Sequence, residues 1–219
     1  MPQPLSGKLG SNPHLQFFFS GGFVKRQKIA VYYARAMDEF GVCEGQLAAL
    51  YLILNKDRPD AAYTELQNNI TYSSRIRLVR KDLASLSTDD QALGYATLHR
   101  AESAAKMRNK IAHCTWGFSE QLPDCVLRVP TAPRDIRERL KQRLGIAFHR
   151  EAAEVGIFCY TMADFDNIRL AALNAAAPLT IFCDYLMGRT EVKQVILSDP
   201  DTKFQYEKFL TELTTEKDL

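Results

Sequence analysis

The segment that decides the fold spans residues 87–113 and reads STDDQALGYATLHRAESAAKMRNKIAH. It opens on Ser87-Thr88-Asp89-Asp90, a cluster of short polar side chains of the kind that accept hydrogen bonds from the first N–H groups of a helix. The apolar residues that follow have helical spacing. We therefore expect one long helix that starts at Asp89 or Asp90 and ends at about His113. Its alanines allow a second helix to approach closely.

The second half of this predicted helix carries a polar stripe. Its members are spaced by four, three and four residues, so that a turn of 100° per residue places them on one face: Glu102, Lys106, Asn109 and His113. Histidine has an unperturbed pKa of about 6.5 and can exchange protons near neutrality. Arg108 lies beside the stripe, and its planar guanidinium suits a phosphate group. Such a pair can cleave RNA without a metal: the histidine moves the proton of a ribose 2′-hydroxyl or of the leaving oxygen, and the arginine offsets charge on the phosphorane.

The spacing of the two groups raises a geometric question. Arg108 and His113 are five residues apart, which corresponds to about 140° around an ideal helix. Three arrangements bring them together: a distorted helix end, an arginine that reaches around the helix, or a site completed by another chain. The third arrangement predicts a symmetric dimer in which two copies of this helix end face each other.

The run Arg108-Asn109-Lys110-Ile111-Ala112-His113 resembles the R-x(4–6)-H motif of the HEPN superfamily (higher eukaryotes and prokaryotes nucleotide-binding domains). The resemblance covers about residues 25–188, and 98–118 is its specific part. It implies an all-α, HEPN-like helical bundle that forms a homodimer through the motif helix, here residues 90–113. It further implies a metal-independent endoribonuclease without a cofactor, in which the 2′-hydroxyl of RNA attacks. Arg108 and His113 would be the catalytic pair and Asn109 the supporting polar residue. Many members act in toxin–antitoxin or defence systems, so a cognate antitoxin is a further expected partner.

Two positions depart from the family pattern. Cys114 stands where a glycine often follows the motif histidine, and Thr115 stands where one type of toxin has a tyrosine. These departures leave an alternative open, a non-catalytic HEPN-like module that binds RNA, a nucleotide or a protein partner. In that case Arg108 and His113 are cations that complement the dipole at a helix C-terminus.

Further candidate substrate-binding residues flank the motif. Arg75 and Arg77 belong to a run of four basic residues in seven, which forms either a solvated helix face or a track for the RNA backbone. Glu102 and Lys106 form either an i,i+4 ion pair or a group that orients the catalytic pair. The expected substrate-binding set is Lys106, Glu102, Arg75 and Arg77.

The rest of the chain predicts an all-α class with one small β-hairpin. The expected elements are a helix from Val24 to Phe40 ended by Gly41, a helix from Glu44 to Asn55, short helices over 61–69 and 73–85, a hairpin of Trp116-Gly117-Phe118 with Cys125–Val129, a helical segment over 161–188 interrupted near Pro178, and a weak amphipathic helix in the tail. Residues 134–150 form a helix or a partly ordered linker. We expect an irregular arm over 1–22, a helical domain over 23–190 and a tail over 191–219.

Composition excludes several classes of protein. With 219 residues, 46% hydrophobic residues and a net charge of +2, the chain fits one globular domain and not a protein that coats nucleic acid. The five cysteines are odd in number and lack C-x-x-C spacing, and the four histidines lie far apart, so neither a disulfide framework nor a zinc site is expected. The longest apolar run, Leu47–Leu54, is too short for a membrane span, and we expect a cytoplasmic protein.

Overall fold

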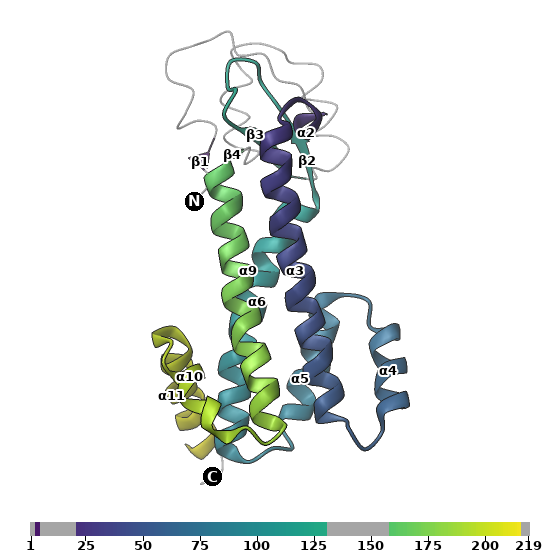
Figure 1. The fold of residues 1–219 in the computed structure, drawn as a ribbon, viewed down its shortest axis with the longest axis vertical. Helices are drawn as coiled ribbons and strands as arrows, with labels where there is room; N and C mark the ends of the chain where they lie inside the picture. The colour runs from purple at the N-terminus through teal and green to yellow at the C-terminus, as the bar shows by residue number, and fades with distance from the viewer. Residues whose placement is uncertain (1–2, 5–20, 131–157, 216–219) are drawn as a thin grey trace. The chain divides into compact units, whose positions relative to one another are not determined.

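The structure is a computed structural model that describes residues 3–4, 21–130 and 158–215 (Figure 1). This part of the chain is mostly helical, as the sequence predicts, and the predicted hairpin belongs to a small antiparallel sheet with two further strands. The helices are α2 (Gly22–Lys25), α3 (Gln27–Leu54), α4 (Pro59–Asn68), α5 (Tyr72–Leu83), α6 (Thr88–Ala112), α9 (Met162–Leu186), α10 (Lys193–Leu197) and α11 (Pro200–Thr215), with a 3-10 turn η1 (Thr190–Val192). The strands are β1 (Gln3–Pro4), β2 (Cys114–Gly117), β3 (Val126–Pro130) and β4 (Phe158–Tyr160). The segment 134–150 and most of the predicted arm lie outside the described residues.

The chain divides into two compact units. The first, the sheet unit, comprises the described residues of Met1–Met37 and Met107–Arg169. The second, the helical unit, comprises those of Asp38–Lys106 and Leu170–Leu219. Among the helices that the structure describes, none is both long enough and apolar enough to cross a membrane.

The sheet unit is built on the predicted hairpin. Its strands have the order β1-β4-β3-β2 with antiparallel pairing, and Trp116 of β2 lies opposite Arg128 of β3. Five aromatic rings pack together beside the sheet, with neighbouring centroids 4.6–6.1 Å apart: Phe23, Tyr33, Trp116, Tyr160 and Phe165. Helix α2 approaches β2 so closely that a Cβ at Gly22 would lie 2.5 Å from the carbonyl oxygen of Gly117, so only glycine fits there.

The helical unit is organised around the first part of α6. Ser87 caps this helix as predicted, because its Oγ accepts a hydrogen bond from the Asp90 N–H at 3.2 Å. Nearly all of the residues from Gln91 to Leu98 are buried, and Gly94 lies against the side chains of Leu83 and Phe182. Helix α5 buries one apolar side with Ile76, Val79 and Leu83, and Leu83 is fully inaccessible to solvent.

The sequence-based division of α3 at Gly41 is wrong. One helix of 28 residues runs from Gln27 to Leu54 and includes both Gly41 and Gly45. Glycine ends a helix when it adopts a left-handed conformation, and in the described residues positive φ occurs only at Gly21 and Gly188. A glycine with helical φ costs only about 1 kcal/mol relative to alanine, so the apolar residues on either side carry the helix through.

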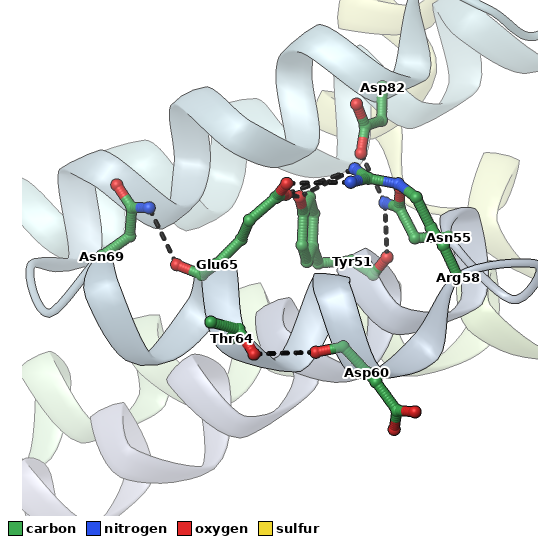
Figure 2. A network of polar contacts seen from close by, with 8 residues as sticks. All are labelled: Tyr51, Asn55, Arg58, Asp60, Thr64, Glu65, Asn69 and Asp82. Atoms are coloured by element: carbon green, nitrogen blue, oxygen red, sulfur yellow. Dashed lines mark hydrogen bonds and ion pairs between the residues drawn. The ribbon is translucent and has the colours of Figure 1, made fainter.

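A network of polar side chains joins α4 to α3 and α5 in the helical unit (Figure 2). The buried Tyr51 hydroxyl donates to Glu65, and Arg58 Nη1 donates to the other oxygen of that carboxylate at 2.8 Å. Asn55 donates through Nδ2 to the carboxylate of Asp82 on α5. These residues are dispersed along the sequence, which is why pattern analysis did not identify them as a group.

Candidate functional site

The predicted motif lies where α6 ends and β2 begins. Helix α6 ends at Ala112, His113 follows in a turn, and β2 starts at Cys114. Two side chains satisfy carbonyl groups of the last helical turn: Cys114 Sγ donates to the oxygen of Ile111 at 3.1 Å, and Arg128 Nη1 donates to the oxygen of Lys110 at 3.4 Å. The end of the helix is thereby fixed one residue before the motif histidine.

The structure brings the three predicted catalytic residues together within one chain. Arg108 Nη1 lies 3.4 Å from His113 Nε2 and donates to Asn109 Oδ1, also at 3.4 Å. His113 is exposed and Arg108 is half-buried, so both groups are open to solvent. Because α6 stops before His113, the angle of 140° for a continuous helix does not apply. The contact therefore requires neither a long reach around the helix nor a second copy of the chain.

A second arginine at this end was missed by the sequence analysis. Arg128 extends from β3, and the centre of its guanidinium lies 4.8 Å from the centroid of the Phe158 ring. The same side chain donates to the Lys110 carbonyl, so Arg128 ties the sheet to the last turn of α6. Its signal in the sequence is a single charge inside the apolar run Cys125–Val129. That signal identifies an unusual strand residue but not its partner, which lies 18 positions earlier in the chain.

Burial shapes the titration of the groups beside the pair. Burial raises the pKa of the Cys114 thiol to about 11, against the opposing effect of the Arg128 charge. Burial is also the main cause that raises the pKa of Tyr33, with Cys114 adding to the rise and Arg108 opposing it. Tyr33 is half-buried within the aromatic cluster. Neither group supplies a proton acceptor at neutral pH.

The four predicted substrate-binding residues lie in the helical unit, whereas the Arg108–His113 pair lies in the sheet unit. Among the described residues, Glu102 forms its ion pair with Arg80 of α5 and not with Lys106. Arg75 Nε donates to the carbonyl oxygen of Asn69 at 3.0 Å and so stabilises the turn between α4 and α5. Lys106 and Arg77 are exposed to solvent.

The cysteines offer no cross-link, since all five are free thiols. Within the described ranges, no three side chains of His, Cys, Asp or Glu gather in a group that could hold a metal ion. No protein-family model, no curated protein and no solved structure matches this chain.

Proposed function

We propose that this protein is a metal-independent endoribonuclease of the HEPN type. The observation that carries the proposal is the contact of 3.4 Å between Arg108 Nη1 and His113 Nε2 at an exposed helix end. A general base and a cation at this separation can act on adjacent atoms of one phosphodiester, because a 2′-hydroxyl and a non-bridging phosphate oxygen are close neighbours in RNA.

The reaction follows from the chemistry of the two groups. The neutral His113 imidazole accepts the proton of a ribose 2′-hydroxyl, and the oxygen attacks the adjacent phosphorus. The bond from phosphorus to the 5′ oxygen breaks, that oxygen takes a proton from water, and the products carry a 2′,3′-cyclic phosphate and a 5′-hydroxyl. His113 then returns its proton to the solvent. Arg108 neutralises the charge on the phosphorane, and its hydrogen bond to Asn109 holds the guanidinium beside the imidazole.

Cleavage of labelled single-stranded RNA in excess EDTA tests the proposal. We expect cleavage to persist, to leave 2′,3′-cyclic phosphate ends, and to fall at least about a hundredfold in His113→Ala and in Arg108→Ala. The matched controls are His99→Ala, on the same helix, and Arg189→Ala, which removes an arginine paired with Asp184. Cleavage that is lost with EDTA, or that survives in both motif variants, would contradict the proposal.

The second candidate is a non-catalytic module that binds RNA, a nucleotide or a protein. The observation that favours it is the gathering of Arg108, Arg128 and His113 at the C-terminus of α6, where cations stabilise a helix without any chemistry. It predicts that His113→Ala lowers stability or partner binding while intact RNA is recovered from every incubation.

The proposal includes a homodimer formed through the end of α6. The residues of this helix that are fully exposed all lie in its C-terminal half: Ser103, Lys106, Asn109 and Lys110. A second copy would therefore find the most accessible surface of α6 toward the motif. Each copy contributes its own Arg108–His113 pair to such a dimer.

A further inference from the structure

A pocket of about 470 Å³ lies in the sheet unit where α2 meets α3. One part of its wall is cationic, with Lys25, Arg26 and Lys28, and Asp124 is the carboxylate in the lining. Another part is apolar and includes Val24 and Met162. The volume lies in the range of pockets that bind small molecules, and the lining combines a positive with an apolar surface.

The cations of the pocket differ in how firmly they are held. Arg26 is 12% exposed at its side chain, and its Nη2 donates to the carbonyl oxygen of Ser119 at 2.8 Å. Its Nε is buried and has no hydrogen-bond partner among the described residues. Lys25 and Lys28 are exposed, and the described part of the chain provides neither with an ion-pair partner. The pocket therefore has one guanidinium, held by the Ser119 carbonyl and 3.7 Å from the Glu120 carboxylate, and two exposed ammonium groups, a combination that suits a phosphate.

The backbone adds to this preference for an anion. Helix α3 begins at Gln27 in the pocket wall, and the first N–H groups of a helix lack partners within the helix. The first turn of α3 contains no acidic residue to occupy these groups. Beside the cations, Val24 and Met162 are 75% and 41% exposed, which leaves apolar surface for a flat ring. A phosphate that carries a nucleoside matches both parts of the pocket.

The pocket and the motif are connected through β2. This strand starts at Cys114, directly after His113, and extends for about 10 Å to Gly117, against which α2 is packed. The Phe23 ring of α2 lies 5.1 Å from the Trp116 ring of the same strand. An RNA strand that presents one phosphodiester to His113 can therefore reach the pocket within a few nucleotides.

We infer that this pocket binds one nucleotide of the single-stranded RNA substrate, with its phosphate on Lys25, Arg26 and Lys28 and its base against Val24 and Met162. The inference rests on the proposed function, since it assigns a position to a nucleotide outside the cleaved bond. The shared chemistry is a phosphate group, which RNA, a mononucleotide or inorganic phosphate can supply.

Binding of a fluorescent single-stranded RNA to the His113→Ala protein tests this inference without cleavage. The double variant Lys25→Gln/Lys28→Gln is compared with Lys203→Gln/Lys208→Gln on α11, which removes the same charge from two surface ion pairs. We expect the first variant to bind RNA about tenfold more weakly or worse, with the slope of log affinity against log salt smaller by up to about 0.7, because one contact with a single-stranded phosphate contributes about 0.7. We expect the control variant to bind as the parent protein does.

Competition with AMP and with inorganic phosphate separates the sources of the phosphate. A nucleotide site is supported if AMP displaces RNA at a lower concentration than phosphate does, and if this difference is lost in Lys25→Gln/Lys28→Gln. Three results overturn the inference. They are an equal loss of RNA affinity in the two lysine double variants, no binding of RNA at all, and displacement of RNA by AMP and by phosphate at the same concentration. The nuclease and the pocket can be contradicted separately. If RNA binds through the pocket but is never cleaved, the nuclease is contradicted. If the Lys25→Gln/Lys28→Gln variant of the active protein cleaves RNA as fast as the parent protein does, the pocket is contradicted.

Discussion

At the scale of single residues, the neighbours His113 and Cys114 have opposite environments. His113 is exposed beside a guanidinium, whereas the Cys114 thiol is half-buried and donates to the Ile111 carbonyl. A thiol must ionise to act as a nucleophile, and burial opposes ionisation. In the proposed reaction these environments favour the histidine, and not the cysteine that follows it, as the reacting group.

The reactivity of Cys114 tests this assignment. Burial raises its pKa from 9.0 to about 11, so the thiolate fraction at mildly alkaline pH falls about a hundredfold. We expect Cys114 to react with iodoacetamide about a hundred times more slowly in the folded protein than in denaturant, measured by mass spectrometry of its peptide. A Cys114 that is modified equally fast in both states would show that burial does not suppress its thiolate.

At the scale of elements, local signals predicted some boundaries and failed at others. The polar cluster at Ser87 marked the start of α6 because capping depends on residues within one turn. The strand β4 was missed, since its three residues pair with β3 about 30 positions earlier, a contact that no local pattern encodes. The motif placed Arg108 and His113 together, but their contact depends on where α6 ends, which Arg128 and Cys114 help to fix from outside the helix.

The continuous helix α3 leads to a prediction at its glycines. Gly41 has helical φ, and a Cβ added there meets no atom within 4 Å. We expect Gly41→Ala to stabilise the protein by about 0.5–1 kcal/mol, because alanine restricts the unfolded chain without strain in the helix. Urea unfolding monitored by circular dichroism measures the change.

Gly94 provides the matched control on α6. A Cβ there would lie 2.6 Å from Leu83 Cδ2 and 3.1 Å from Phe182 Cε1, inside a filled core. We expect Gly94→Ala to destabilise the protein by about 1 kcal/mol or more through overpacking. Equal effects of the two substitutions would contradict the helical path through Gly41.

The C-terminal helices depend on the acidic start of α6. Asp89 accepts hydrogen bonds from Lys193 and from the Tyr206 hydroxyl, and these bonds hold its pKa below the ordinary value. Because the folded pKa is lowered, the stabilisation is present above the unfolded pKa of about 4 and is lost as the pH falls through the folded value. The contacts between α6 and the segment that carries α10 and α11 should therefore weaken in acid.

Hydrogen exchange of residues 193–215 measures this effect. We expect Asp89→Asn at neutral pH to increase exchange there and to lower the melting temperature by roughly 2–4 °C, the equivalent of about 1 kcal/mol. Acidification of the wild-type protein below about pH 4 should increase exchange in the same segment. Asp124→Asn, in the sheet unit, is the control, and exchange that responds equally to both substitutions would contradict the contact with Lys193 and Tyr206.

At the scale of the whole molecule, charge constrains the proposed dimer. The net charge of +2 disfavours a broad basic surface, yet basic groups gather at the end of α6 with Arg108, Lys110 and Arg128. A two-fold axis near this end brings two copies of the same cations together, and like charges repel more strongly at low salt. The dimer should consequently be favoured by salt and by a bound polyanion such as RNA.

Sedimentation velocity of the wild-type protein and of Asn109→Arg tests the dimer. Asn109 is exposed on α6 one residue after Arg108, so the substitution adds one positive charge per copy where the two copies would meet. We expect the dissociation constant of the dimer to rise about tenfold or more at low salt, because a repulsion of about 1.4 kcal/mol corresponds to that factor. The rise should be smaller at high salt, because ions screen the repulsion. Thr211→Arg on α11 adds the same charge elsewhere and should leave association unchanged. Two results would contradict a dimer formed through this end of α6. One is a wild-type protein that is monomeric at every salt concentration, with and without RNA, and the other is a dimer whose dissociation constant does not change in Asn109→Arg. In either case each Arg108–His113 pair would act without the other.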